Sequence, residues 1–257
     1  HVRRLRASAE RLRLLVPFDD DTLAARTHDT IVAAGELDEA YIRILLTRGV
    51  GELNYDPKST PAPTLVIIVK PLEEPPARVF NDGIRISLVP VLRNHPGSVN
   101  PLIKSNNLLN NALAMQEAHR RGGEEGLMCN YRGELSECAQ ANFFMVRHGV
   151  ALTPKSTAGL LEGVTRGFLF EVGRDVGIDV RDEVLLPNDV LLTRGPGGGI
   201  AELRELAGAP EWRAGGLEED TALTDLDRAV DVLVEMKNIS EVAVGLAYSA
   251  VLFNDQG

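Results

Sequence analysis

The chain has 257 residues, of which 44% are hydrophobic and 25% are charged, and its formal net charge is −10. This length allows two small domains with a sizeable core. The acidic balance argues against a nucleic-acid-binding protein, whose contact surface is basic. No apolar run reaches the ~18 residues that a membrane span needs, so we expect no membrane partner.

The two cysteines and five histidines do not suggest a metal centre. Cys129 and Cys138 have neither a disulfide-framework spacing nor a metal-ligand spacing, which is typical of cytosolic thiols. The histidines are scattered without ligand spacing. Residues 1–5 lack the apolar segment of a secretory signal. We therefore expect a cytoplasmic protein without a metal ion.

The first part of the chain predicts two helices and two strands. A basic amphipathic pattern predicts a helix over residues 3–15, and Asp19–Asp21 predict the start of a helix that runs to Ala34. β-Branched and aromatic content predicts a strand over Tyr41–Thr47. The continuous apolar run Thr64–Val69 predicts a strand that is buried on both faces.

Prolines at positions 71, 75 and 76 then predict a linker. We therefore divide the chain into a small α/β domain (1–73), a second domain (77–193), and a linker with a helical tail (194–257). The second domain carries patterns that predict seven elements: strand signals over 79–92, a helix over 104–122, short strands near 126–131, 142–147 and 150–153, a helix over 164–177, and a strand near 178–185.

Three features suggest a site for a phosphorylated aldehyde cofactor. A lysine such as Lys104 can form a Schiff base with an aldehyde and later move a proton. An acidic residue such as Glu137 can keep a pyridine nitrogen protonated. Gly163-Val164-Thr165, at the start of a predicted helix, offers backbone N–H groups to a phosphate.

The order and the amino-acid sequences of these motifs resemble those of the class IV aminotransferases, which share fold type IV of the pyridoxal phosphate enzymes. Lys104-Ser105-Asn106-Asn107-Leu108-Leu109 is similar to the cofactor-lysine segment of D-amino acid aminotransferases. Glu137 with Asn142-Phe143 and then Leu161-Glu162-Gly163-Val164-Thr165-Arg166 follow in the family order. The resemblance implies an α+β chain with a small α/β domain and a larger pseudo-barrel domain.

The resemblance also implies roles for individual residues. Lys104 would bind pyridoxal 5′-phosphate and act as acid and base, and Glu137 would pair with the pyridine nitrogen. The remaining cofactor contacts would come from Arg4, Asn142, Leu161, Val164 and Thr165. Arg4 and the main chain of Val164 and Thr165 would contact the phosphate, and Leu161 would pack on the ring.

Ala40-Tyr41-Ile42-Arg43 resembles the branched-chain aminotransferase segment whose Tyr and Arg bind the substrate carboxylate. An arginine offers two donors to two carboxylate oxygens. Leu53 and Tyr55 stand where D-amino acid aminotransferases have an Arg and a His, which disfavours the D-specific function. The resemblance thus implies transfer of an amino group from an amino acid to a 2-oxo acid such as 2-oxoglutarate, by a homodimer.

The chain departs from the family pattern at both ends. Two strands that usually precede position 1 are missing, as is the phosphate-binding turn expected after Leu192, so we expect a chain truncated at both ends. Segments within 233–253 resemble the first helix of a PhoU-like domain. Three alternatives therefore stay open: an aminodeoxychorismate lyase, a D-amino acid aminotransferase, and an inactive aminotransferase-derived body in a PhoU-like regulatory fusion.

Overall fold

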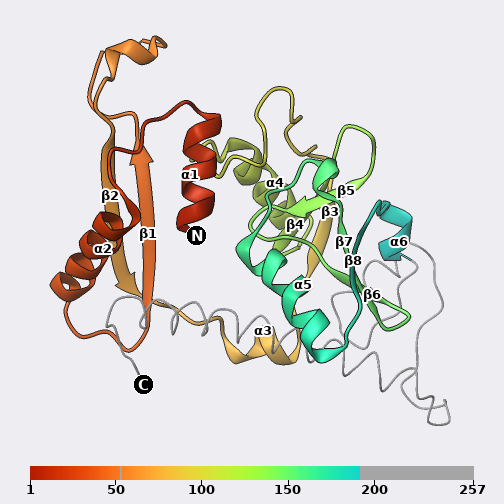
Figure 1. Cartoon of the computed structure of the whole chain (residues 1–257). Helices are drawn as coiled ribbons and strands as arrows, with labels where there is room; N and C mark the ends of the chain where they lie inside the picture. Colours follow the sequence, from red (N-terminus) through yellow and green to blue (C-terminus); the bar gives the residue numbers. More distant parts are fainter. Residues whose placement is uncertain (53, 192–257) are drawn as a thin grey trace, which may run out of the picture. The chain divides into compact units, whose positions relative to one another are not determined.

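The computed structural model describes residues 1–52 and 54–191. These residues form two compact units that divide between Pro75 and Pro76 (Figure 1). Among the described helices, none is long and apolar enough to cross a membrane. The predicted helical tail and its PhoU-like resemblance lie outside the described residues.

Unit 1 consists of helices α1 (Val2–Arg11) and α2 (Asp20–Ala34), the short helix η1 (Pro57–Ser59), and an antiparallel pair of strands, β1 (Ala40–Thr47) and β2 (Thr64–Pro71). The pair runs in continuous register from Ala40 opposite Pro71 to Thr47 opposite Thr64. Helix α2 packs against β2 (Figure 1). Asp19 caps α2 as predicted, because its carboxylate accepts a hydrogen bond from Thr22 N at 2.8 Å.

Strand β2 differs from the prediction of a strand buried on both faces. Its residues alternate between exposed and half-buried, with Leu65, Ile67 and Val69 on the less exposed face. Among the described residues β2 pairs only with β1, and α2 packs on the pair. A two-stranded sheet with a helix on one side covers one face only, so an apolar run alone overstated the burial.

Helix α1 ends at Arg11, earlier than predicted, because the chain makes a helix-terminating turn there. Arg13 has a φ of 50°, and the N–H groups of Arg13 and Leu14 bond to the carbonyls of Glu10 and Ala9. This pattern normally has a glycine at the left-handed position. An arginine there gave no signal in the sequence.

Gly49 is required where the chain leaves β1, so we predict that Gly49→Ala destabilises unit 1. Its φ is 93°, and an added Cβ would lie 1.8 Å from the carbonyl oxygen of Ala62. The backbone strain alone costs about 1–3 kcal/mol. Gly35→Ala is the matched control, because Gly35 has a φ of 90° but open space around its Cβ position. Urea unfolding should show the larger loss for Gly49→Ala; equal losses would contradict the steric argument.

Unit 2 contains two three-stranded sheets and their covering helices. Its helices are α3 (Ala77–Asn81), α4 (Leu109–Arg120), η2 (Ser156–Ala158), α5 (Val164–Val176) and α6 (Pro187–Leu191). One sheet has the order β3 (Ile86–Val89), β4 (Glu125–Cys129), β5 (Leu135–Cys138), and the other has the order β6 (Met145–Arg147), β7 (Val150–Pro154), β8 (Val180–Glu183). In each sheet one strand pair is parallel and one is antiparallel.

Two apolar clusters hold unit 2 together, and β4 contributes to both. Leu127 belongs to a cluster that contains Leu135 and Leu152, one from each sheet, and Phe143 from the segment before β6. The next residue, Met128, points the other way and packs with helix α4. Successive strand residues face opposite sides, so β4 joins α4 on one side to the second sheet on the other.

Three segments of unit 2 differ from the predictions. Residues 77–81 form helix α3, and only Ile86–Val89 form the strand predicted over 79–92. Helix α4 begins at Leu109, so Lys104 precedes the helix instead of opening it. Strand β5 was not predicted.

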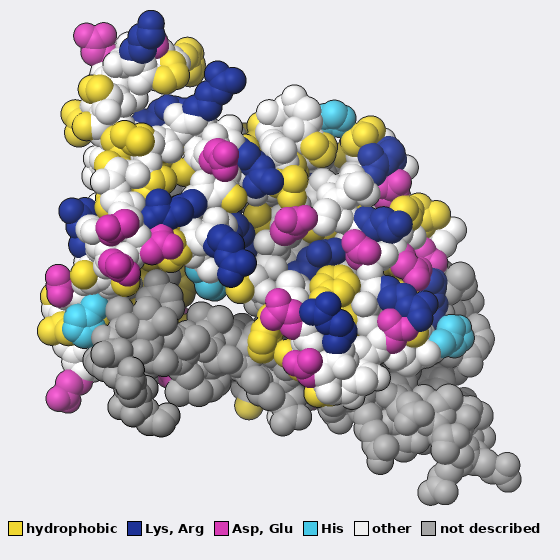
Figure 2. All heavy atoms as spheres, viewed as in Figure 1, with side chains coloured by type: hydrophobic (Ala, Val, Ile, Leu, Met, Phe, Trp, Pro, Cys, Tyr) yellow, Lys and Arg dark blue, Asp and Glu magenta, His cyan; other side chains and the backbone are white. Residues whose placement is uncertain are grey.

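The surface carries charges of both signs. In Figure 2, Lys and Arg side chains are interspersed with Asp and Glu side chains over the described part of the visible face. Several of these charges form exposed ion pairs, such as Arg121 and Arg120 with Glu117 on α4. These two arginines lower the pKa of the Glu117 carboxyl to about 2.

Candidate active site

A β-bulge in β5 places Glu137. Between two paired positions, β4 advances two residues, from Leu127 to Cys129, while β5 advances three, from Cys138 to Leu135. The extra residue allows both Leu135 and Cys138 to enter the apolar core. Bulges re-aim the side chains next to them. Here the bulge leaves Glu137 directed toward polar partners in the interior.

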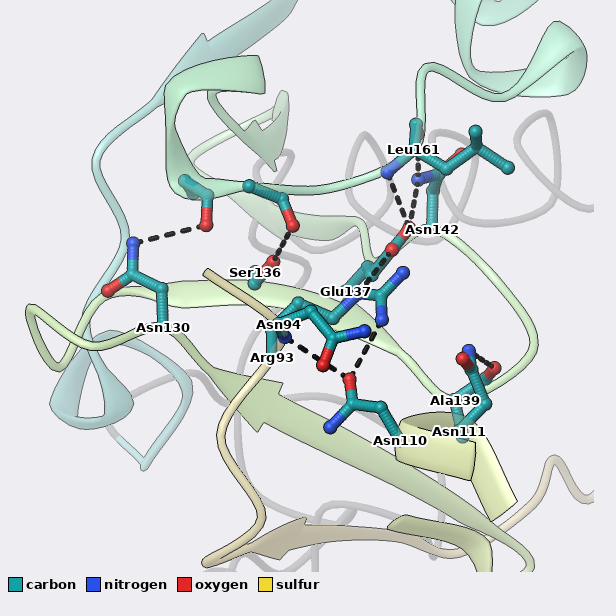
Figure 3. A network of polar contacts seen from close by, with 12 residues as sticks. Arg93, Asn94, Asn110, Asn111, Asn130, Ser136, Glu137, Ala139, Asn142 and Leu161 are labelled. Atoms are coloured by element: carbon teal, nitrogen blue, oxygen red, sulfur yellow. Dashed lines mark hydrogen bonds and ion pairs between the residues drawn. The ribbon is translucent and has the colours of Figure 1, made fainter. Parts of the chain in front are cut away.

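The Glu137 carboxylate accepts three hydrogen bonds (Figure 3). Arg93 Nε donates to Oε1 at 2.8 Å. Asn142 Nδ2 and the backbone N–H of Leu161 donate to Oε2 at 3.1 and 3.0 Å. A carboxylate offers about four acceptor positions, so these contacts leave room for one more donor, at Oε1.

Asn142 and Leu161, which contact the carboxylate, are also bonded to each other. Asn142 lies opposite Glu137 in an isolated antiparallel bridge, which brings the two side chains to the same side. Asn142 Nδ2 also donates to the carbonyl of Leu161 at 2.8 Å. Both backbone polar groups of Leu161 are therefore bonded to site residues, and this fixes the chain just before α5.

The site is charged and largely buried. Exposed fractions are 9% for the Arg93 side chain and 6% for that of Glu137. Burial raises the pKa of the Glu137 carboxyl, and the charges of Arg93 and Lys104 and the Leu161 N–H oppose that rise. Burial also lowers the pKa of Arg166, whereas the negative charge of Glu137 raises it. Burial raises the pKa of the Cys138 thiol.

Lys104 lies on the loop over residues 95–108, and its side chain is exposed. Its positive charge acts on the carboxylate of Glu137, so the structure brings these two predicted residues into electrostatic reach of each other. Backbone and serine hydrogen bonds at Ser105 and Asn107 form local turns here. Such local bonds compete with helix formation, which explains why the helix begins after Lys104.

A hollow of about 380 Å³ adjoins this loop. Its lining includes His95, whose ring centroid lies 4.4 Å from that of Tyr131, together with Leu102 and Gly159. Leu102 and Gly159 each stand two residues before a site residue, Lys104 and Leu161. The hollow is therefore bounded by the two segments that carry them.

Helix α5 begins directly after the site, with Gly163 as its N-cap. Among the described residues, no side chain caps this end of the helix. The N–H groups of the first turn, including those of Val164 and Thr165, therefore have no side-chain cap as acceptor. The N-terminus of a helix favours an anion such as a phosphate.

Gly163 also packs against Asn142, and we predict that Gly163→Ala destabilises the site. An added Cβ would lie 2.1 Å from Asn142 Oδ1, and the amide cannot move away without breaking its bonds to Glu137 and Leu161. Forced overpacking of this kind costs about 1–3 kcal/mol.

The matched control for this variant is Gly167→Ala, in the same helix but with nothing within 4 Å of its Cβ position. We expect Gly167→Ala to stabilise the chain by roughly 0.5–1 kcal/mol. Urea unfolding of both variants measures the contrast. A Gly163→Ala protein as stable as Gly167→Ala would contradict the packing described here.

The remaining predicted site residues belong to unit 1. Arg4 lies in α1, is half-buried, and has its pKa lowered by burial. Tyr41 and Arg43 lie two residues apart on β1, both on its more exposed face. Lys70 faces Tyr41 across the strand pair, with its Nζ 5.3 Å from the ring centroid. This face of β1 is thus aromatic and basic.

Sequence reasoning missed Arg93 and Asn110. Arg93 provides the charge that faces Glu137, and its Nη1 donates to Asn110 Oδ1 at 2.8 Å. Arg93 lies just beyond β3, and its backbone N–H bonds to the Cys129 carbonyl at 2.8 Å. The only signal was one arginine directly before the Asn94–Gly97 turn, which is too common a pattern to single out.

Residues 1–193 match the family model for class IV aminotransferases. Among curated proteins, a candidate branched-chain-amino-acid aminotransferase of Methanocaldococcus jannaschii is 34% identical over 190 residues, which cover 74% of this chain and 65% of that protein. The branched-chain-amino-acid aminotransferase of Escherichia coli is 30% identical over 187 residues, covering 72% and 60%. The chain thus spans somewhat less than two thirds of these relatives.

Solved structures give the same result. The crystal structure of the E. coli branched-chain amino acid aminotransferase matches with a TM-score of 0.71 and 30% identity, over 75% of this chain and 64% of that one. The enzyme of Thermoproteus uzoniensis shares the fold with a TM-score of 0.71, 23% identity, and coverage of 92% and 78%. The predicted fold type IV is therefore confirmed, and the chain belongs to the class IV aminotransferase family.

Proposed function

We propose that this chain is a pyridoxal-phosphate-dependent aminotransferase that moves the amino group of a branched-chain amino acid to a 2-oxo acid such as 2-oxoglutarate. The observation that carries the proposal is the buried carboxylate of Glu137, held by three donors and within electrostatic reach of Lys104. The likeness to branched-chain aminotransferases supports the choice of substrate class.

The residues present fit pyridoxal phosphate. The open acceptor position on Glu137 Oε1 suits a protonated pyridine nitrogen. The α5 N-terminus, whose N-cap has no room for a Cβ beside Asn142, suits a phosphate that contacts the main chain of Val164 and Thr165. In this proposal Arg4 adds a charged contact to the phosphate, and Leu161 packs on the ring.

When bound, the cofactor supplies an electron sink for negative charge at the substrate α-carbon. Lys104 Nζ would hold the cofactor through its aldehyde carbon. The amine of Lys104 would take up and return the proton of the substrate α-carbon. Glu137 keeps the pyridine nitrogen protonated, while Arg93, Asn142 and Leu161 hold the carboxylate in place.

Substrate recognition belongs to β1 in this proposal. Tyr41 and Arg43 share a face of the strand, and the guanidinium of Arg43 suits bidentate contact with a substrate carboxylate. We also propose the division into a small domain (1–73) and a cofactor-binding domain (77–193), a homodimer, and a cytoplasmic location, all by likeness to the family.

The test is a glutamate-formation assay on the purified chain with pyridoxal phosphate and 2-oxoglutarate. We expect glutamate with leucine, isoleucine or valine as donor, and none from Lys104→Ala. Both stereoisomers of each donor should be compared with D-alanine. A second assay follows pyruvate release from aminodeoxychorismate without an amino acceptor.

The outcomes separate the alternatives. Activity with D-alanine and none with branched-chain donors would identify a D-amino acid aminotransferase. Pyruvate release without glutamate formation would identify a lyase. A folded chain with neither activity would favour an inactive aminotransferase-derived body.

A further inference from the structure

We propose that Asn110 is a positioning residue that sets Glu137, through Arg93, and the loop that carries Lys104. The inference rests on the proposed function, because it assigns Asn110 a part in preparing that same site. Asn110 touches neither Lys104 nor Glu137 in any of its described hydrogen bonds, so it would act only through the residues it holds.

Asn110 closes the loop over residues 95–108 at both of its ends. It is the second residue of α4, directly after the loop. Its Oδ1 accepts from Asn94 N at 3.2 Å, and its Nδ2 donates to the carbonyl of Leu92 at 2.8 Å. Asn110 is therefore hydrogen-bonded to the backbone directly before the loop. Joining the ends of a flexible loop reduces the conformations open to it.

Helix α4 is itself firmly placed, which makes it a suitable anchor. Ala114 and Ala118 are fully buried, and they pack so closely on β4 that a Cβ added to Gly126 would lie 2.8 Å from the Ala114 carbonyl oxygen. The backbone of Asn110, in the first turn of this helix, is therefore held in a fixed position.

Asn110 also fixes the plane of the Arg93 guanidinium. Arg93 uses Nε toward Glu137 Oε1 and Nη1 toward Asn110 Oδ1, both at 2.8 Å (Figure 3). A guanidinium is a planar fork, so two bonds in different directions determine its orientation. Without Asn110 the fork could turn, and Oε1 of Glu137 would lose its aligned donor.

The first experiment needs no cofactor. The Glu137 carboxyl is titrated by NMR on protein with ¹³C-labelled glutamate side chains, and its signal is assigned with Glu137→Gln. We expect Asn110→Ala to raise the pKa of Glu137, because the ion pair with Arg93 is loosened. Asn111→Ala is the matched control, since Asn111 is the adjacent α4 residue but bonds to the Ala139 carbonyl instead, at 2.5 Å.

A second variant tests the route through Arg93. Arg93→Lys keeps a positive charge but cannot bridge both partners as a fork does. In that background, Asn110→Ala should shift the Glu137 titration much less than in the native chain. An equal shift in both backgrounds, or no shift on Asn110→Ala in the native chain, would overturn the proposal.

A readout on the cofactor-loaded protein separates this inference from the proposed function. We expect Asn110→Ala to lower turnover on the order of tenfold or more and to shift its pH profile, with Asn111→Ala doing neither. A native chain that binds no pyridoxal phosphate while Asn110→Ala still shifts Glu137 would refute the function and leave the positioning intact. If the native chain is active but Asn110→Ala does not change the Glu137 titration, the positioning role is refuted and the function stands.

Discussion

Replacing Arg93 with methionine should destabilise the chain by about 3–5 kcal/mol, because it leaves a buried carboxylate without its counter-charge. Both partners are almost fully buried, and their contact is 2.8 Å. Methionine keeps much of the side-chain volume, so the loss reports the charge and its hydrogen bonds more than packing. Urea unfolding followed by circular dichroism measures it.

The pH dependence of this loss has a definite sign. Because burial raises the pKa of Glu137, its contribution to stability is fully present below the ordinary glutamate pKa and is lost as the pH rises through the folded value. Removing Arg93 raises that folded value further. The deficit of Arg93→Met should therefore shrink toward acid pH and grow toward neutral pH; a deficit independent of pH would contradict the ion pair.

A double variant provides the control. In Arg93→Met with Glu137→Gln, neither charge is buried, and a glutamine oxygen can still accept from Asn142 and Leu161. We expect the double variant to be more stable than the sum of the single losses allows. Strict additivity would mean that the two side chains do not interact energetically.

Glu137→Gln has the largest expected effect on catalysis apart from loss of Lys104. An uncharged amide cannot keep a pyridine nitrogen protonated, so the electron sink weakens while the shape of the site is preserved. Loss of one such electrostatic group typically costs about 10²–10³-fold in turnover.

The measurement for Glu137→Gln is single-turnover transfer from leucine at a temperature where the variant is folded. Substrate affinity should change much less than turnover, since Tyr41 and Arg43 are the proposed carboxylate contacts. Gln140→Ala serves as a control for mutation near β5, because Gln140 is exposed. Turnover near the native rate for Glu137→Gln would contradict the assigned role.

The sequence indicated three residues that the structure places together, but it did not indicate every element that carries them. Glu137, Asn142 and Leu161 were grouped by their order in a family motif, and the structure joins them by hydrogen bonds. Strand β5 was missed because the bulge breaks the two-residue alternation that identifies strands. Its polar residues also resembled a turn, because their partners come from distant segments.

Arg93 and Asn110 could not have been predicted, because their partners also come from distant segments of the chain. Arg93 and Glu137 are 44 positions apart, and each has an ordinary local sequence. Only the pairing of β3 with β4 and the approach of α4 bring them together. A buried ion pair depends on tertiary contacts, whereas the cap at Asp19 and the start of α5 at Val164 depend on neighbours within a few residues.

The proposed attachment of the cofactor to Lys104 is tested most directly by chemical trapping. The native chain is incubated with pyridoxal phosphate, reduced with borohydride, digested, and searched by mass spectrometry for the modified lysine. The chain has five lysines, at positions 58, 70, 104, 155 and 237, so the site can be assigned without ambiguity. We predict stoichiometric modification of Lys104 and its absence in Lys104→Ala. Modification spread over the other lysines, or none at Lys104, would contradict the account.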